Sequence, residues 1–387
     1  MKSGYEVIIL GLGGIGSGAI YHLARRGVDV LGIEQFEIGH IRGASQDHSR
    51  IIRLSYHTPE YVELAKQAYA AWADLEADAG EKLIVRTGGL DLFPPHGAIP
   101  MADYTGSMST AGVRFETLGA ADVMRRWPQF TLDPGIIALF QEESGIAPAA
   151  KCSAAHIRMA RTYGASIVTN APVTGLRSSG PDILVEAGGA RYTCRNLVIA
   201  AGAWTNAALA HLRHRLPLEV TQEQVIYYAS PKPDDFKPDR FPIWIWMDEP
   251  CFYGFPVYGE AGPKVAQDVG GRRVTTETRT FEPDPVAAMR IERFLHQVLP
   301  GIPGPQIEAK TCLYTLTPDR DFILDNLPDH PNVFIAVGAG HAFKFASVLG
   351  RILSELVLDG RTETDISAFR FDRPILHMEN PPRSYMI

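Results

Sequence analysis

A glycine-rich turn follows directly after the apolar run 5–10 near the start of the chain. It contains Gly11, Gly13, Gly14 and Gly16, with Ile15 before the last of them. Gly11 permits a sharp turn at the end of a strand, Gly13 leaves room for a pyrophosphate, and Gly16 lets a helix pack closely on the sheet. Backbone N–H groups at the start of that helix, expected over 14–26, would face the phosphates. The turn therefore predicts the binding of a dinucleotide.

The second apolar run, 28–33, ends at a carboxylate, Glu34. Its spacing from the glycine turn is that expected of a residue that accepts hydrogen bonds from a ribose. A carboxylate at this point would also repel a 2′-phosphate, so we expect NADP not to bind. The strand, the turn, the helix and the acidic residue together form a far more specific pattern than the glycines alone.

The elements that position these residues alternate between strands and helices, which indicates an α/β fold with two domains. A discontinuous, Rossmann-like nucleotide domain is expected over residues 1–83, 149–217 and 312–387. A β-sheet-based substrate domain is expected over residues 84–148 and 218–311. The helices expected outside the first unit cover residues 60–78, 152–164 and 285–299 and a last stretch that ends near 358.

The composition excludes several classes of function. The chain has 387 residues, of which 45% are apolar and 21% charged, and this length allows two domains with ample cores. The net charge of −7 and the lack of basic runs with interleaved aromatic residues argue against a nucleic-acid partner. The apolar segments are far shorter than the ~20 residues of a membrane span, and the N-terminus lacks the pattern of a signal peptide. We therefore expect a cytoplasmic enzyme without a membrane partner.

Four cysteines are scattered along the chain, at Cys152, Cys194, Cys251 and Cys312. Their spacing matches neither a metal site nor a disulfide framework, and free thiols suit a reducing compartment. We expect no metal site.

Two later segments favour a flavin over NAD, because both classes of enzyme share the first turn. The strand-like run 197–202 ends in Ala201 and Gly202 and is followed by Trp204, as in two-domain flavoproteins that bring a second strand end to FAD. The buried-type strand 333–338 then enters a turn with Gly338, Gly340 and His341. The helix that follows would point its N–H groups at the cofactor, where they stabilise negative charge on a reduced ring.

Over essentially its whole length the chain resembles the monomeric sarcosine oxidase and N-methyltryptophan oxidase group of the D-amino-acid-oxidase-like flavoproteins. The matching segments are the glycine turn and residues 49–53, 252–256, 262–264, 311–315, 321–325 and 338–344. The resemblance implies a two-domain flavoprotein that oxidises the C–N bond of a secondary amino acid and passes a hydride equivalent to flavin N5. Dioxygen would then reoxidise the flavin and yield hydrogen peroxide, and the imine product would be hydrolysed. The implied partners are a small amino-acid substrate and O2, in a role in amino-acid catabolism, and we expect a monomer because nothing in the site requires a second subunit.

The resemblance also implies roles for single residues. Cys312 would bond through sulfur to the 8-methyl carbon of FAD, so that the cofactor cannot dissociate. Arg53 and Lys344 would grip the substrate carboxylate, and Arg50 would lie near the flavin ring. Lys264 matches the lysine that activates oxygen, since a fixed cation stabilises superoxide. The expected cofactor contacts are Gly11, Gly13, Gly14, Ile15, Gly16, Glu34, Gln35, Ser45, Arg50, Val173, Ala201, Gly202, Trp204, Cys312, Gly338, Gly340, His341 and Lys344.

The substrate pocket departs from the family pattern at one point. Tyr253 and Tyr314 match tyrosines that line the pocket, but Asp268 stands where the sarcosine-type enzymes have a histidine, and Gln267 replaces a tyrosine. Both changes remove ring bulk, and Asp268 adds negative charge. We expect a substrate that is larger or more polar than sarcosine, such as an amine with hydroxyl groups or a second cation. The alternative is that Asp268 is a solvated turn residue.

Several related activities fit the same pattern. N-methyl amino acids, cyclic imino acids and fructosyl amino acids all present a carboxylate and an unprotonated secondary amine, so a fructosyl-amino-acid oxidase is an alternative with the same chemistry. A flavin dehydrogenase that uses an acceptor other than oxygen is a second alternative. An NAD-dependent dehydrogenase is supported by the first turn alone. Since a protonated amine cannot release hydride, the rate is expected to rise toward alkaline pH.

Overall fold

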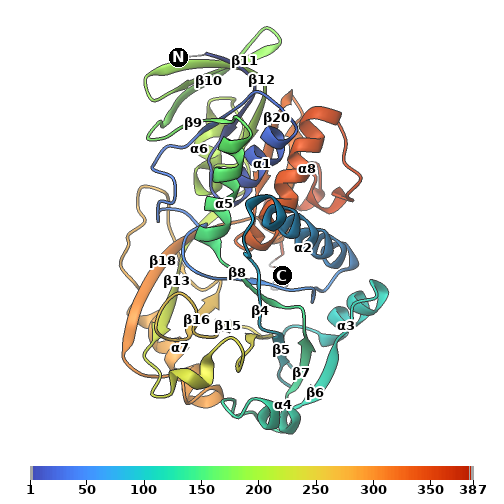
Figure 1. Cartoon of the computed structure of the whole chain (residues 1–387), viewed down its shortest axis with the longest axis vertical. Helices are drawn as coiled ribbons and strands as arrows, with labels where there is room; N and C mark the ends of the chain where they lie inside the picture. The colour runs from blue at the N-terminus through green and yellow to red at the C-terminus, as the bar shows by residue number, and fades with distance from the viewer. Residues whose placement is uncertain (1–2, 383, 385–387) are drawn as a thin grey trace.

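The computed structural model describes residues 3–382 and 384 of the chain. Two large sheets lie in opposite halves of the molecule, and the long helices α1, α2, α5 and α8 gather around the first of them (Figure 1). The chain is therefore the two-part α/β fold that the sequence predicts. In the described part of the chain, no helix combines the length and the apolar character that a membrane crossing requires.

The first sheet contains eight strands and is mainly parallel at its centre. Its central strands are buried because helices cover them, which explains their continuous apolar sequence. In spatial order its main path runs through β10 (Val173–Ser179), β11 (Asp182–Ala187), β12 (Ala190–Ile199), β1 (Gly4–Leu10), β2 (Val30–Ile33) and β9 (Ser166–Val168). Beside β12 lies β20 (His330–Val337), which pairs in turn with β19 (Ile323–Leu327).

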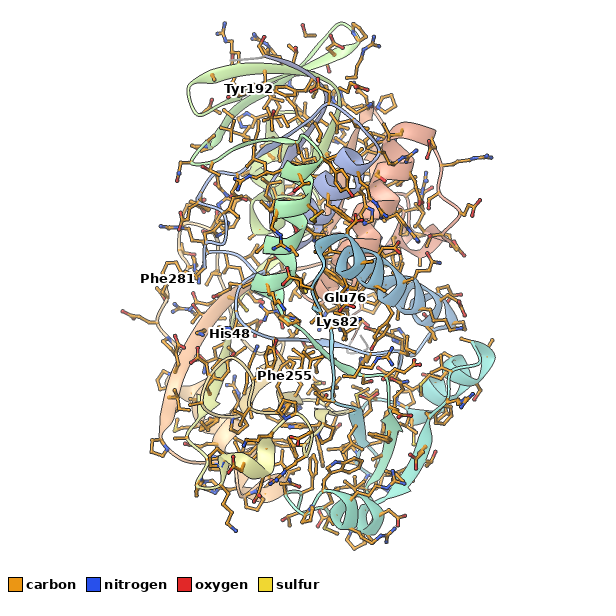
Figure 2. The ribbon with its side chains drawn as sticks, viewed as in Figure 1. His48, Glu76, Lys82, Tyr192, Phe255 and Phe281 are labelled. Carbon is orange, nitrogen blue, oxygen red and sulfur yellow. The ribbon has the colours of Figure 1, made fainter. Side chains whose placement is uncertain are left out.

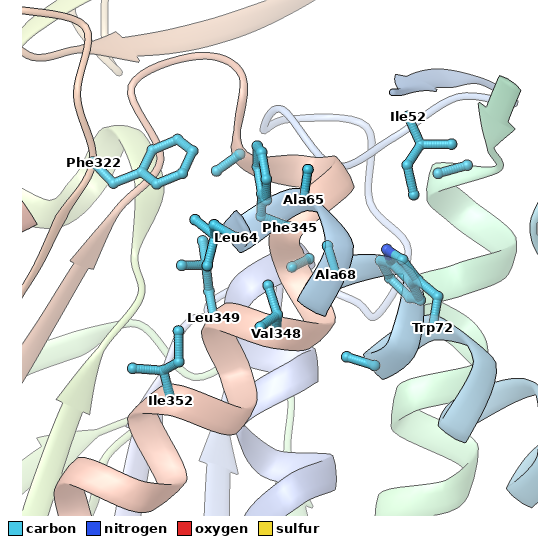
Figure 3. Packing of buried hydrophobic residues seen from close by; sticks show 14 of the residues in the cluster. Ile52, Leu64, Ala65, Ala68, Trp72, Phe322, Phe345, Val348, Leu349 and Ile352 are labelled. Atoms are coloured by element: carbon cyan, nitrogen blue, oxygen red, sulfur yellow. The ribbon is translucent and has the colours of Figure 1, made fainter. Parts of the chain in front are cut away.

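Close helix packing holds this half together. The helices are α1 (Gly14–Arg25), α2 (Pro59–Ala79), α5 (Ala149–Thr162), α6 (Thr205–Ala210) and α8 (Ala346–Asp359). The backbones of α1 and α8 touch where Gly18 faces Gly350, and a Cβ atom on Gly350 would come within 2.2 Å of the Gly18 carbonyl carbon. Apolar side chains of α2, including Leu64 and Ala68, meet Val348 of α8 in one core cluster (Figure 3).

The second sheet has nine strands, and its two faces have different neighbours. In order they are β17 (Arg272–Arg273), β13 (Glu219–Tyr228), β16 (Lys264–Asp268), β15 (Cys251–Phe255), β14 (Ile243–Trp246), β5 (Gly89–Phe93), β7 (Ile137–Gln141) and β6 (Glu116–Gly119), with β18 (Gln306–Leu316) also paired to β13. Helix α7 (Pro285–Val298) covers one face: its Phe294 packs in a core cluster with Trp244, Phe252 and Val265. Because side chains alternate along a strand, the neighbouring residues point to the opposite face.

Smaller elements join the halves. A three-stranded sheet is formed by β3 (Arg50–Ile52), β8 (Gly145–Ala147) and β4 (Val85–Arg86), and the short helices α3 (Met101–Thr110) and α4 (Ala120–Arg126) lie beside the second sheet (Figure 1). The helices expected from the sequence appear as α1, α2, α5, α7 and α8 within a few residues. The domain boundaries stay a prediction, and the one drawn between 311 and 312 falls inside β18.

Candidate active site

A cavity of about 660 Å³ extends from the glycine turn after β1 to the inner face of the second sheet. His48 and Phe255, which both line it, lie in the middle of the molecule where the two halves meet (Figure 2). Most residues predicted from the sequence line this cavity: Gly11, Gly13, Gly14, Ile15, Glu34, Gln35, Ser45, Arg50, Val173, Ala201, Gly202, Trp204, Tyr253, Asp268, Tyr314, Gly338, Gly340, His341 and Lys344. Four predicted residues do not line it: Gly16, Arg53, Lys264 and Cys312.

The glycine turn has the geometry that a bound pyrophosphate needs. Gly11 has a positive φ of 88°, and a Cβ atom there would come within 2.7 Å of the Ala200 carbonyl oxygen. A Cβ atom on Gly16 would lie 1.9 Å from the Gly11 carbonyl oxygen, so Gly16 permits close packing, as expected, without itself facing the cavity. Helix α1 begins at Gly14, whose N–H donates to Ser45 Oγ at 2.8 Å, and the N–H groups that follow at the helix start could face an anion.

Glu34 is fixed as a charged acceptor at the end of β2. It is buried, and its two carboxylate oxygens accept hydrogen bonds from the backbone N–H groups of Leu12 (2.9 Å) and Phe36 (3.1 Å). Burial acts to raise the pKa of Glu34, but His40 and these N–H groups outweigh it and lower the pKa. A fixed negative charge here fits a ribose diol and disfavours a 2′-phosphate. The cavity, the turn and Glu34 therefore fit FAD.

Arg50 begins β3 and lines the cavity, and the nearby Asp47 carboxylate favours its positive charge. Its guanidinium donates to the carbonyl oxygens of Ser49 (2.6 Å), Ala44 (2.7 Å) and Gln46 (2.8 Å). In the described part of the chain no carboxylate forms an ion pair with it. These three hydrogen bonds fix the Arg50 guanidinium to the loop before β3. Its positive charge therefore acts on a ligand bound in the cavity.

Lys344 and Arg53 both lie against the ring of Tyr56. The Nζ atom of Lys344 is 5.6 Å from the centre of the Tyr56 ring, and the Arg53 Cζ atom is 5.0 Å from it. Arg53 is 1% exposed and its Nη1 lies 3.1 Å from Asp91 Oδ1, whereas Lys344 lines the cavity and has no carboxylate partner among the described residues. Burial and the charge of Arg53 lower the pKa of Lys344 to about 7.

The backbone around Lys344 is held from two sides. The residue lies in the short 3-10 helix Ala342–Phe345, directly after the turn with Gly340, whose φ is 84°. Its carbonyl oxygen accepts a hydrogen bond of 2.7 Å from Trp72 Nε1, and Figure 3 shows Trp72 on α2 near the start of α8. Tertiary packing therefore fixes the position from which the ammonium group reaches the cavity.

Lys264 is buried beneath the cavity and uses all three of its N–H donors. Its Nζ lies 2.7 Å from Asp47 Oδ2, 2.9 Å from the Ser49 carbonyl oxygen and 3.0 Å from Ser49 Oγ. Burial lowers the pKa of Lys264 to about 8, and Asp47 opposes this effect. Asp47 is in turn contacted by Lys310 (3.2 Å) and by the Tyr227 hydroxyl (2.9 Å). Asp47 was not among the residues predicted from the sequence, where its only signal is its place in the polar loop before Arg50.

Cys312 is a buried thiol on β18, beside the cavity residues Leu313 and Tyr314. Burial raises its pKa to about 11, although the charge of Arg50 acts in the opposite direction. All four cysteines are free thiols, and the described residues contain no cluster suited to a metal ion.

Asp268 is not a solvated turn residue. It ends β16, is 8% exposed, lines the cavity, and its Oδ2 lies 3.1 Å from both Nη1 and Nη2 of Arg320. Gln267 lies on the opposite face of β16, where its Oε1 accepts a hydrogen bond of 3.1 Å from Arg290 Nε. Its change from the family's tyrosine therefore does not widen the cavity. Trp244 and Trp246 also pack against Phe294, away from the cavity.

The register of the second sheet explains why these residues converge. Lys264 is paired with Phe255 and Tyr227, Asp268 with Cys251, and Cys312 with Glu223. These residues, together with Tyr253 and Tyr314, stand on one face of the sheet, which is the face opposite α7. Asp91 joins this face through the pairing of β5 with β14. Asp91 lies inside the apolar run 88–93, and a charged residue in such a run indicates that it is buried with a partner. No comparable pattern in the sequence marks Arg320 as a partner of Asp268.

Comparisons with known proteins agree with this geometry. The model of the family described as FAD dependent oxidoreductase matches residues 6–356. The chain is 32% identical over 381 residues to monomeric sarcosine oxidase of Bacillus sp. (strain B-0618), covering 97% of this chain and 98% of that protein. It is 31% identical over 378 residues to N-methyl-L-tryptophan oxidase of Salmonella arizonae, covering 95% and 99%.

A solved structure shows the same fold. An open form of NikD, described as an unusual amino acid oxidase essential for nikkomycin biosynthesis, superposes with a TM-score of 0.85 at 24% identity, covering 100% of this chain and 99% of that chain. Since the family model spans most of the chain and full-length relatives exceed 30% identity, this protein belongs to the family of FAD-dependent oxidoreductases.

Proposed function

We propose that the protein is an oxidase of the C–N bond of a secondary amino acid with an N-methyl, cyclic imino or other N-substituted group. The observation that carries this proposal is Lys344, an ammonium group without a carboxylate partner among the described residues, which lines a cavity that fits FAD. When bound, FAD supplies the ring that takes up a hydride equivalent and passes the electrons on. The relatives named above act on amino acids of this class.

Lys344 binds the substrate carboxylate in this proposal. The positive charge of Arg53, which lies against the same Tyr56 ring, adds to the field at the cavity wall, although Asp91 compensates part of it. A bound carboxylate favours the charged form of Lys344, because an opposite charge nearby raises the pKa of an ammonium group. The affinity for a carboxylate therefore declines above about pH 7, where the unliganded Lys344 loses its proton.

The substrate amine must be unprotonated before its neighbouring carbon can release hydride. Asp268, the carboxylate of the second sheet that lines the cavity, is already paired with Arg320, so it is not free to hold the ammonium form. Lys344 and Arg50 instead disfavour a second positive charge nearby. We expect the rate of reduction under saturating substrate to rise toward alkaline pH, and a flat profile would contradict this chemistry.

Lys264 is the proposed oxygen-activating residue. It carries a buried positive charge on the sheet face that borders the cavity, and a fixed cation stabilises superoxide as dioxygen is reduced. The product would be hydrogen peroxide. A dehydrogenase with another acceptor remains the alternative, and the yield of peroxide per substrate oxidised decides between the two.

Cys312 is the proposed covalent anchor for FAD, on the basis of the matched segment 311–315 and its place beside the cavity. The raised pKa means that the thiol must lose its proton during attachment, and the positive charges of Arg50 and Lys264 favour the thiolate. The monomeric state and the cytoplasmic location remain predictions from the sequence.

The proposed function is tested in two steps. The purified protein is expected to be yellow, and acid precipitation is expected to leave the flavin absorbance in the pellet. Anaerobic mixing with a panel of N-methyl, cyclic and N-substituted amino acids should bleach the flavin spectrum, and air should restore it with one peroxide per turnover. Colourless protein that cannot be reconstituted with FAD, or a flavin that no secondary amino acid reduces, would overturn the proposal.

A further inference from the structure

Asp268 lines the cavity, and only one of its two carboxylate oxygens accepts hydrogen bonds in the described structure. Both Nη atoms of Arg320 contact the same atom, Oδ2, at 3.1 Å. No hydrogen bond to Oδ1 is present among residues 3–382 and 384. The side chain is 8% exposed and lines the cavity, so the open oxygen is accessible only from within it.

Arg320 is fixed by its surroundings and is buried with its partner. It is 6% exposed and has a positive φ of 66°, a conformation that few side chains adopt without support. His341 Nε2 lies 2.8 Å from the Arg320 carbonyl oxygen, and Thr317 Oγ1 donates to the Asp321 carbonyl oxygen at 2.7 Å. These bonds hold the turn that carries the guanidinium.

The ion pair changes what Asp268 can recognise. A lone buried carboxylate would select a cation, but Arg320 already supplies one positive charge, and Lys344 and Arg53 carry further positive charge nearby. A second cationic group on the substrate would therefore be repelled. A neutral hydroxyl or N–H group, in contrast, gains a hydrogen bond to a charged acceptor, which is stronger than a bond between neutral groups. A substrate without such a donor leaves the open oxygen unsatisfied.

We propose that Asp268, with Arg320 as its positioning residue, selects secondary amino acids that carry a neutral hydrogen-bond donor near the amine. The inference rests on the proposed function and names its substrate class. It narrows the expectation drawn from the sequence, which allowed either hydroxyl groups or a second cation.

Three compounds that differ at one position test this proposal: N-ethylglycine, N-(2-hydroxyethyl)glycine and N-(2-aminoethyl)glycine. A second pair, N-methylalanine and N-methylserine, places the hydroxyl on the side chain instead. The ratio of kcat/KM between each donor compound and its partner is measured by anaerobic reduction and by peroxide release. We expect at least one hydroxyl compound to exceed its partner by about ten-fold or more, and the aminoethyl compound to be the poorest of its set.

Variants separate recognition from folding. The double variant Asp268→Leu with Arg320→Met removes the pair without leaving a buried charge, and we expect the hydroxyl preference to vanish while N-ethylglycine is still oxidised. Asp268→Asn should keep a reduced preference, because the amide oxygen still accepts. Asp325→Asn removes a carboxylate that pairs with Arg370 (3.1 Å) away from the cavity, and this control should leave the ratios unchanged.

Two results would overturn the inference: wild-type protein that prefers the compounds without a donor, or a double variant that retains the hydroxyl preference. Dissociation constants of the same compounds, obtained from the concentration dependence of anaerobic flavin reduction in stopped flow, give a readout separate from turnover. If no compound reduces the flavin at all, the proposed function itself has failed, which is a different outcome from activity without donor selectivity.

Discussion

Replacing Asp47 with asparagine tests how the buried Lys264 keeps its charge. The two side chains are 2% and 3% exposed, and Lys264 Nζ lies 2.7 Å from Asp47 Oδ2. Asparagine is almost the same size and retains an acceptor oxygen, so the contact can persist while its negative charge is lost. The change thus isolates electrostatics from packing.

The expected effect is large because the pair is buried. Two unit charges about 4 Å apart interact by about 4 kcal/mol at the effective dielectric constant of 20 that suits such sites. At 1.36 kcal/mol per ten-fold, this corresponds to roughly a thousand-fold change in the protonation constant of Lys264. Other groups near Lys264 are Arg50 and Lys310, which disfavour its charge, and Cys312, a protonated thiol near neutrality. Since the pKa of Lys264 is about 8 with Asp47 present, the variant lysine would be neutral at pH 7.5.

The assay follows the two half-reactions separately by stopped flow. At pH 7.5 we expect the rate constant for the reaction of reduced enzyme with O2 to fall to that of Lys264→Met, while anaerobic reduction by substrate is unchanged. Lowering the pH should restore the oxygen reaction in Asp47→Asn, because the lysine regains its proton, but should not do so in Lys264→Met.

The matched control is Glu260→Gln. Glu260 belongs to the same ion-pair network through Lys310, at 3.1 Å, but does not contact Lys264, so its loss should leave the oxygen reaction nearly intact. The reasoning is refuted if Asp47→Asn reacts with O2 at the wild-type rate at pH 7.5, or if its loss of rate is the same at every pH.

Three further outcomes are expected. Cys312→Ser should still bind flavin but release it into the supernatant on acid precipitation; retention in the pellet would show that another residue forms the bond. Lys344→Met should raise KM for the substrate by about 100-fold, because a buried hydrogen bond to a charged group is lost, while the flavin content stays normal. An unchanged KM would show that Lys344 does not bind the substrate carboxylate. Gly16→Ala should lower the free energy of unfolding by about 1–3 kcal/mol, because the added Cβ would lie 1.9 Å from the Gly11 carbonyl oxygen. An unchanged Tm in a variant that is fully loaded with flavin would contradict this.

Local patterns in the sequence were sufficient to predict which residues come together at the nucleotide end of the cavity. The turn from Gly11 to Gly16 and the carboxylate of Glu34 belong to one strand, helix and strand unit, so their spacing along the chain determines their spacing in the fold. Long helices such as α2 were also predictable, because Thr58 caps the start and Gly80 ends it in a left-handed conformation.

The substrate end depends on pairings between distant segments, which spacing alone does not determine. Lys264 and Asp47 are 217 residues apart, and Arg320 reaches Asp268 across 52 residues. Family resemblance identified Lys264 and Asp268, but not the residues that form ion pairs with them. Neighbours in the sequence can also lie far apart in function. Gln267 is next to Asp268 in the sequence, but side chains alternate along a strand, so Gln267 points to the opposite face of the sheet.

In the proposed function, the placement of Lys264 and Asp268 on one strand keeps the reaction with oxygen apart from the recognition of the amine. Four residues of extended chain separate the two side chains by about 13 Å, and each has its own counter-ion from a different loop. Under this proposal, mutations that change which amine is accepted can be confined to positions 268 and 320, while the proposed oxygen-reactive charge at position 264 stays intact. Substrate preference could then diverge among related enzymes while the residues for the reaction with oxygen stay the same.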